Sequence, residues 1–200
     1  RDSCYDLLME VAEAMEVTDY ITFTTSPMQV RFRNGSRIIF KGMDKPAKLK
    51  SLNGVSIVWI EECSEVKYAG FKEILGRLCH PTLSNHIILS TNPVSKSNWV
   101  YKYFFQDKAA GYKVLDDEEL YQNRIMVVGN TYYHHSTVDD NYFVPADYIE
   151  QLDELQQHDP DLYRVARKGR FGINGRLVFP QFEVRTEREI AECMKGITNP

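Results

Sequence analysis

The sequence predicts an α/β protein with a mainly parallel sheet flanked by helices, followed by a small helical subdomain. Three observations favour this class. Residues 55–60 form an apolar, β-branched run, which is typical of a buried strand in a parallel sheet. A helical pattern follows over residues 64–80, and a second short strand follows at 86–89. A strand, a helix and a strand of these lengths predict a parallel crossover unit.

The elements before this unit follow from periodicity and turn residues. An amphipathic helix is expected at 2–16, with its apolar stripe facing inward: Leu7, Leu8, Val11 and Met15. Three strands are expected before the crossover unit, at 20–25, 28–33 and 37–41. Asn34-Gly35 predicts a tight hairpin between the last two of them.

The elements after the crossover unit are mostly helical. Helices are expected at 97–106, 145–157 and 160–168, and a strand at 124–132. Asp159 is expected to cap the last helix, and Gly169 to end it. The acidic run 116–119 is expected to be a solvated loop or a helix start. The change from strand-rich to helix-rich sequence near residue 140 predicts a subdomain boundary.

Two carboxylates follow the first strand of the crossover unit directly. Glu61 and Glu62 stand at its carboxyl end, where open α/β sheets bind their ligands. In nucleotide-hydrolysing sheets, one such carboxylate holds Mg²⁺ and the next orients or deprotonates the attacking water. We therefore assign Glu61 to Mg²⁺ and Glu62 to the water. The alternative is a buried strand that ends in a solvated pair of glutamates.

Small polar residues follow the second strand at the same predicted edge. Ser90, Thr91 and Asn92 could hydrogen-bond a γ-phosphate or the attacking water, and Pro93 ends the strand. The alternative is an ordinary turn, because Thr-Asn-Pro favours turns. The acidic pair beside them favours the phosphate-sensing hypothesis.

Several segments resemble the large terminase subunit of tailed bacteriophages and prophages. They include Trp59-Ile60-Glu61-Glu62 and the Ser-Thr-Asn-Pro-Val-Ser segment at 90–95. The others follow the family's order along nearly the whole chain, at 35–44, 48–51, 99–102, 137–141, 163–169 and 175–180. The resemblance implies a DNA-packaging motor, with an N-terminal ATPase of the RecA-like P-loop type and a C-terminal nuclease of RNase H-like fold.

The resemblance also implies cofactors and partners. ATP and Mg²⁺ would be the cofactors, and ATP hydrolysis would drive double-stranded viral DNA into a prohead. The implied partners are this DNA, the small terminase subunit, the portal protein of the prohead and further copies in a homo-oligomeric ring. The implied location is the bacterial host cytoplasm, with no membrane contact.

The chain departs from the family pattern in two respects. It stops at Asn199-Pro200, roughly where the nuclease domain of the family is expected to begin, and it shows no clustered aspartates of the nuclease type. It contains no G-x-x-x-x-G-K-[ST] segment, the loop that cradles phosphates, and it begins at Arg1 rather than at Met. In the family this loop lies shortly before a helix such as the one expected at 2–16. We therefore expect the chain alone to be inactive. We expect 1–140 to be an ATPase core, and 141–200 a lid and linker subdomain that leads to the nuclease.

Two other functions are compatible with these residues. One is another RecA-like helicase or translocase, which would share the acidic pair but act on a different nucleic acid. The other is a non-catalytic terminase remnant that binds motor partners. A P-loop upstream and clustered nuclease aspartates downstream would favour the terminase. Helicase motifs would favour the helicase or translocase. Absence of both would favour the non-catalytic remnant.

Basic residues supply two further candidates. Arg77 lies in the predicted helix after the acidic pair and off its apolar stripe, so it is a candidate arginine finger or a structural salt-bridge partner. Lys45, Lys48 and Lys50 belong to the basic segment 31–50 and are candidates for binding DNA phosphates. The alternatives for that segment are a solvated face or a contact with a neighbouring subunit.

Composition is ordinary for a globular protein. The formal net charge of −4 argues against a protein that coats DNA over its whole surface. The four cysteines and five histidines show no metal-binding spacing, and the cysteine usage suits a reducing compartment. No apolar stretch is long enough to span a bilayer.

Overall fold

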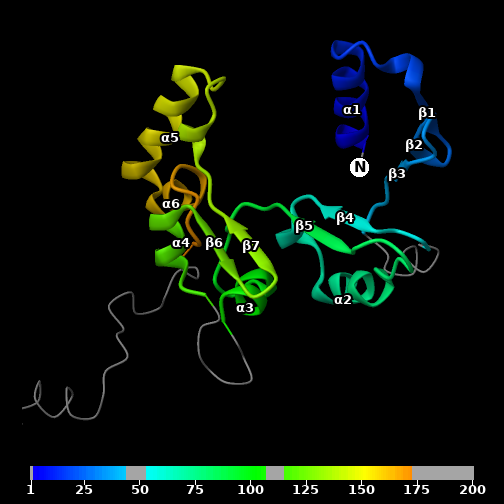
Figure 1. The fold of residues 1–200 in the computed structure, drawn as a ribbon. Coiled ribbons are helices and arrows are strands. Elements are labelled where there is room, and N and C mark those ends of the chain that lie inside the picture. Colours follow the sequence, from blue (N-terminus) through cyan, green and yellow to red (C-terminus); the bar gives the residue numbers. More distant parts are fainter. Residues whose placement is uncertain (1, 44–52, 107–114, 173–200) are drawn as a thin grey trace, which may run out of the picture.

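The structure is a computed structural model that describes residues 2–43, 53–106 and 115–172. Within these ranges it is a mixed α/β structure with three small sheets, of which one is parallel. A larger, mainly parallel sheet is not formed by the described residues. The helices and strands, arranged as in Figure 1, are α1 (Asp2–Ala14), β1 (Ile21–Thr25), β2 (Met28–Phe32), β3 (Arg37–Ile39), β4 (Ile57–Ile60), α2 (Tyr68–Arg77), β5 (His86–Leu89), α3 (Trp99–Phe104), α4 (Asp117–Asn123), β6 (Ile125–Val128), β7 (Thr131–His134), α5 (Ala146–His158) and α6 (Pro160–Ala166).

The first sheet is antiparallel, in the order β1-β2-β3. The predicted hairpin is confirmed, because Gly35 has φ +88° and the Asn34 side chain accepts a hydrogen bond from the Ser36 amide at 3.0 Å. Helix α1 packs on this sheet through Tyr5, whose ring meets Phe23 edge-on at 5.8 Å between centroids. The prediction of which face of α1 points inward is wrong. Tyr5 and Ala12 are buried, whereas Leu7, Val11 and Met15 are exposed.

The crossover unit has the predicted strand order. Strand β4 pairs with β5 in parallel, from Ile57 opposite His86 to Ile60 opposite Leu89. The expected helix is shorter than predicted, because a 3-10 turn, η3 (Cys63–Glu65), precedes α2. Helix α2 covers one face of the strand pair, so β4 is not buried on both sides as predicted. On the opposite face, exposed hydrophobic side chains remain among the described residues: Ile57 (57%), Trp59 (60%) and Ile88 (53%).

The second half of the chain contains an unpredicted hairpin. Strands β6 and β7 pair antiparallel where a single strand was expected at 124–132. Gly129, with φ +61°, and Asn130 form the two-residue turn between them. The cap of α6 is as predicted: the Asp159 carboxylate accepts the Leu162 amide hydrogen bond at 3.0 Å, and Gly169, with φ +58°, follows the helix.

Two hydrophobic clusters form the described core. The first lies between the parallel strands, α2 and α3, around Ile60, Cys63, Phe71, Ile74 and Val100. The second joins α3 to α4 and the β6–β7 hairpin, and its buried members are Tyr101, Phe105, Leu115, Leu120, Tyr121 and Phe171. Helix α3 therefore contributes to both clusters. The second cluster holds residues from both sides of position 140, where the subdomain boundary stays a prediction.

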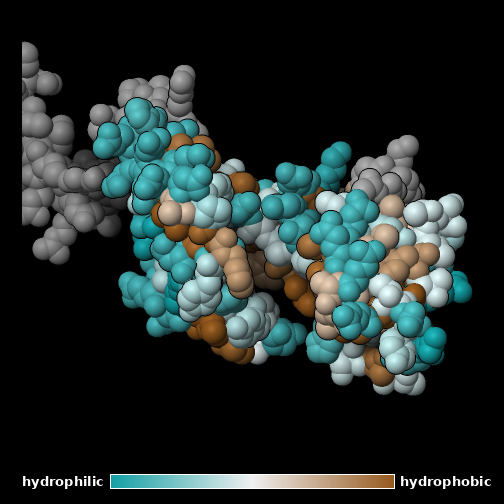
Figure 2. Space-filling model, turned by 90° about the horizontal axis from the view of Figure 1, so that it is seen from above, coloured by the Kyte–Doolittle hydropathy of each residue, from teal (hydrophilic) through white to brown (hydrophobic). Residues whose placement is uncertain are grey.

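The surface is uneven on the face seen from above in Figure 2. Two groups of residues stand apart on that face, and brown hydrophobic residues lie along the hollow between them.

Within the described ranges, none of the helices has both the length and the apolar character that a membrane span requires.

Phe71 is expected to be the residue of α2 on which the first cluster depends most. It is 2% exposed and stacks on Trp99 at 4.7 Å between ring centroids. Phe71→Ala should lower the free energy of unfolding by about 3–5 kcal/mol, measured by urea denaturation of the complete protein. Leu75→Ala, on the same helix but 41% exposed, is the control and should cost about 1 kcal/mol or less. Equal decreases for the two variants would contradict this packing.

Candidate functional site

The acidic pair and the polar segment 90–92 lie at one edge of the parallel strand pair. Strand β4 ends at Ile60 and β5 ends at its register partner, Leu89. Because parallel strands share their carboxyl edge, the next residues of both strands emerge side by side. The backbone amide of Ser90 still donates to the Ile60 carbonyl at 3.2 Å, and the amide of Cys63 donates to the Ser90 carbonyl at 3.0 Å.

Ser90 contacts the first glutamate directly. Its hydroxyl donates a hydrogen bond to Oε2 of Glu61. The same hydroxyl accepts a hydrogen bond from the indole Nε1 of Trp59 at 2.8 Å. Trp59 therefore orients the Ser90 hydroxyl, and Ser90 in turn orients the Glu61 carboxylate. The apolar strand run did not predict this role for Trp59, because a buried strand residue was expected there.

Glu62 occupies a strained backbone position. Its φ of 48° and ψ of 51° lie in the left-handed region, and it is followed by the 3-10 turn η3. A non-glycine residue there costs on the order of 1–3 kcal/mol and persists only where neighbouring contacts hold it. Such positions cluster at functional sites, so the strain supports a functional role for this residue.

Residues 61–65 form the acidic turn. The contacts that hold this turn come from the segment after β5. The amide of Ser64 donates to the Thr91 hydroxyl at 3.3 Å, and the Asn98 side-chain amide donates to the Ser64 carbonyl at 3.0 Å. The indole of Trp99 donates to the Val66 carbonyl at 2.7 Å. Sequence reasoning missed Asn98 and Trp99, although both follow the polar segment closely. These bonds fix the acidic turn relative to the polar segment.

The remaining polar residue, Asn92, is exposed beside this turn. Its backbone carbonyl accepts a hydrogen bond from the Thr91 hydroxyl at 3.0 Å. The structure thus brings Glu61, Ser90 and Thr91 into one hydrogen-bonded edge, with Asn92 adjacent to it.

The thiol of Cys63, which directly follows the acidic pair, belongs to the first hydrophobic cluster. It is fully buried, and burial raises its pKa to about 11, with the negative charge of Glu62 adding to the rise. A thiol with this raised pKa stays mostly protonated at neutral pH, which makes Cys63 a poor nucleophile. Its role is to pack the acidic turn, of which it is part, against the first hydrophobic cluster.

The residues at this edge suit Mg²⁺ held together with a nucleotide. The described residues contain no group of three or more histidine, cysteine or carboxylate side chains that would hold a metal alone. Mg²⁺ usually takes one or two protein carboxylates and completes its oxygen ligands with water and substrate phosphates. The exposed Glu61 carboxylate and the Ser90 hydroxyl fit that mode of binding.

Arg77 lies away from this edge. It is in the last turn of α2, and its Nε donates to Oε1 of Glu73 at 2.7 Å, one helical turn earlier. It also lines a small hollow with Val55 and Val58, at the amino end of β4. This is the arrangement of a structural salt bridge, and the arginine-finger role stays a prediction.

The basic segment is described only in part. Lys45, Lys48 and Lys50 lie outside the described residues. In the hairpin before them, Arg31 and Arg37 are register partners on neighbouring strands and line a shallow hollow with Phe32 and Gly35. Two like charges in directly opposite positions repel each other, and an anion between them would relieve that repulsion.

Comparison with known proteins agrees with the resemblance seen in the sequence. A family model described as "Phage terminase large subunit" matches residues 1–170. The PBSX phage terminase large subunit of Bacillus subtilis (strain 168) is 56% identical over 200 residues, which are 100% of this chain and 46% of that protein. The large terminase subunit of Bacillus phage SPP1 is 26% identical over 206 residues, which cover 96% of this chain and 44% of that protein.

The chain is thus an α/β protein whose acidic turn and polar segment lie at the carboxyl edge of parallel strands, the edge at which open α/β sheets bind their ligands. With the family model matched over 1–170, the chain belongs to the phage terminase large subunit family. It spans slightly less than half the length of the curated relatives that it matches.

The burial of Cys63 predicts a large difference between the cysteines in reactivity. At pH 8, iodoacetamide should modify Cys63 at least about 10²-fold more slowly than the exposed Cys79, because the raised pKa leaves little thiolate. Peptide mapping of the folded, complete protein measures both rates. In urea the difference should disappear, which controls for local sequence. Similar modification rates of Cys63 and Cys79 in the folded protein would contradict the burial of Cys63 in the turn.

Proposed function

We propose that this chain forms part of an ATP-driven motor that moves double-stranded DNA into a phage prohead. The observation that carries the proposal is the Ser90–Glu61 hydrogen bond at the shared carboxyl edge of β4 and β5. Family membership favours this function over another helicase or translocase. The two strands would belong to a larger RecA-like sheet in the complete protein. Residues 1–140 would be the ATPase core and 141–200 the lid and linker subdomain.

Each residue at the edge has a proposed task. Glu61, oriented by Ser90 and Trp59, would hold Mg²⁺ together with the nucleotide. When bound, Mg²⁺ neutralises charge on the β- and γ-phosphates. Glu62, held in the left-handed turn, would orient the attacking water and accept its proton. Ser90, Thr91 and Asn92 would sense the γ-phosphate.

The proposed partners follow from the family. They are double-stranded viral DNA, the small terminase subunit, the portal protein of the prohead and further copies of the chain in a ring. The proposed location is the cytoplasm of the bacterial host. Arg77 would act as an arginine finger only toward the nucleotide of a neighbouring copy, since it lies at the opposite end of α2 from the acidic turn.

The two glutamates should fail differently when changed in the complete protein. Glu62→Gln keeps the shape but loses the base, so ATP hydrolysis should fall by about 10²–10⁴ while nucleotide still binds. Glu61→Gln should instead raise the Mg²⁺ concentration needed for hydrolysis. Glu65→Gln, an exposed acid in the same turn, is the control and should hydrolyse ATP normally.

These rates are measured by phosphate release over a Mg²⁺ titration, with nucleotide binding followed by calorimetry. Normal hydrolysis by Glu62→Gln would disprove its assignment. Absence of hydrolysis by the unaltered complete protein would instead favour a non-catalytic remnant that binds motor partners.

The basic segment should contribute to DNA binding through phosphates. Neutralising Lys45, Lys48 and Lys50 together should flatten the slope of log K against log salt by about 0.9 for each DNA phosphate that these lysines neutralise. Fluorescence anisotropy with labelled duplex DNA measures this slope, and thermal melting checks folding. Neutralising Lys67, Lys72 and Lys102, outside the segment, is the control. An unchanged slope in the well-folded first variant would leave the segment as a solvated face or a subunit contact.

A further inference from the structure

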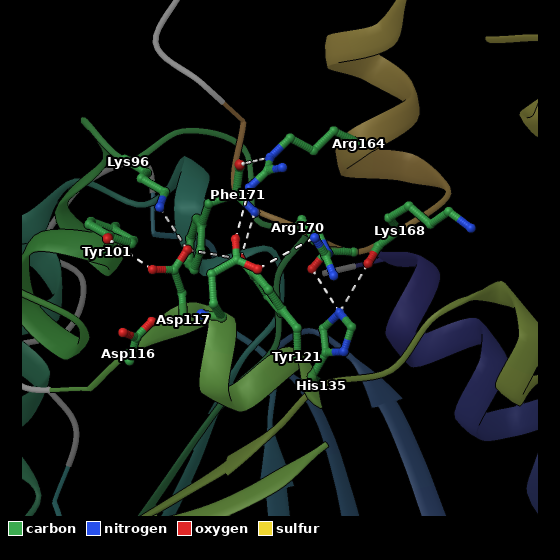
Figure 3. A network of polar contacts seen from close by, with 12 residues as sticks. Lys96, Tyr101, Asp116, Asp117, Tyr121, His135, Arg164, Lys168, Arg170 and Phe171 are labelled. Atoms are coloured by element: carbon green, nitrogen blue, oxygen red, sulfur yellow. Dashed lines mark hydrogen bonds and ion pairs between the residues drawn. The ribbon is translucent and has the colours of Figure 1, made fainter. Parts of the chain in front are cut away.

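Asp117 is a fully buried carboxylate that the proposed function does not use. It is 0% exposed, at the start of α4. The acidic run 116–119 was predicted to be a solvated loop or a helix start; the helix start is confirmed, but the burial of Asp117 was not predicted. Three side chains from three places in the chain donate to it, as Figure 3 shows: Lys96 Nζ at 2.7 Å, the Tyr101 hydroxyl at 3.2 Å and the Tyr121 hydroxyl at 3.4 Å. Burial alone would raise the pKa of Asp117, but the hydrogen bond and charge of Lys96 outweigh it and hold that pKa below its usual value.

Lys96 belongs to the connecting segment (93–96), which directly follows the polar segment at the candidate nucleotide site. Its side chain is 34% exposed, and its ammonium group also lies over the Tyr101 ring at 5.1 Å from the centroid. The ion pair therefore joins the strand of the candidate site to the helical second half of the chain.

The network continues from Asp117 to α6. Tyr121 donates its hydroxyl proton to Asp117 and accepts the backbone N–H of Phe171 at 2.9 Å. The Phe171 carbonyl in turn accepts a hydrogen bond from Nε of Arg164, in α6, at 2.8 Å. A continuous polar path thus runs from Lys96 through α4 to the last described helix.

A second attachment lies beside the first. The Gly172 amide donates to the carbonyls of Pro93 and Val94, each at 3.2 Å, and the Lys96 amide donates to the Gly172 carbonyl at 3.4 Å. A side chain has no room at Gly172, because a Cβ there would lie 2.3 Å from the Val94 carbonyl oxygen. The connecting segment is therefore held at its backbone by residue 172 and at its side chain by Asp117.

An ion pair with one fully buried partner is a poor source of stability, because the cost of desolvating the charges offsets their attraction. The ion pair instead fixes the position of Lys96 relative to α4, because a carboxylate with three donors tolerates little displacement. Its place, six residues after Ser90, makes that geometry relevant to the candidate site: a shift of 90–92 that extends along the connecting segment to Lys96 would either carry Asp117 with it or break the pair.

We infer that Lys96 and Asp117 are positioning residues that make the polar segment 90–92 and the helices after residue 115 move together. This inference rests on the proposed function. It assigns to the pair the transmission of nucleotide-dependent movement, not the chemistry of hydrolysis. Hydrolysis and DNA movement should therefore separate when the pair is removed.

The test is the Lys96→Met, Asp117→Asn double variant of the complete protein. It removes both charges and leaves an amide oxygen for the two tyrosine hydroxyls. ATP hydrolysis should stay similar to that of the unaltered protein, whereas DNA packaged per ATP should fall about tenfold, within the usual range for coupled sites. The readouts are phosphate release and DNA protected from DNase inside proheads. Each single variant should reduce packaging nearly as much as the double, because the pair acts as one unit.

Two further variants keep the test decisive. Asp153→Asn breaks a 2.7 Å ion pair with Arg167 in the same helical part, and it should leave the packaging ratio unchanged. If the double variant does not fold, Tyr121→Phe removes only the hydroxyl between Asp117 and Phe171 and should lower the ratio in the same direction.

The outcomes separate the two proposals. An unchanged ratio in folded variants, or a loss of hydrolysis in proportion to packaging, would overturn the positioning role alone. An unaltered complete protein that neither hydrolyses ATP nor packages DNA would overturn the proposed function itself.

Discussion

The parallel pairing of β4 with β5 determines where the residues of the proposed nucleotide site lie. Four register pairs, ending at Ile60 opposite Leu89, bring the carboxyl ends of both strands to one edge. A glutamate that follows one strand and a serine that follows the other then meet without any further arrangement of the chain. The hydrogen bonds around that edge, from Trp59 to Ser90 and from Ser64 to Thr91, refine positions that the pairing has already set.

The same edge explains why α3 lies between two clusters. Asn98 ties the acidic turn to the start of α3, and its side chain also caps that helix by accepting the Val100 amide at 3.0 Å. Val100 then packs into the first cluster, and Tyr101 into the second. One short helix therefore connects the acidic turn to the core of the helical part, and the Lys96–Asp117 pair lies alongside it.

Local patterns were sufficient for much of this fold. The parallel crossover, the Asn34-Gly35 hairpin and the Asp159 cap follow from residues that are close in sequence. The exposed face of β4 and the exposed stripe of α1 could not be predicted, because apolar periodicity does not state which neighbours cover a face. The β6–β7 hairpin was missed although Gly129-Asn130 is a turn dipeptide. Asp117 was missed because its partner Lys96 is distant in sequence, and an acidic run ordinarily predicts solvation.

The direct test of the proposed nucleotide site is the position of a bound metal ion. Crystals of the complete protein with Mn²⁺ and a non-hydrolysable ATP analogue would locate the ion by anomalous scattering. We expect the metal beside the Glu61 carboxylate, directly or through one water, with the γ-phosphate facing Glu62 and the polar segment 90–92. Metal and phosphates bound at another part of the protein, away from the shared edge of β4 and β5, would contradict the proposed site.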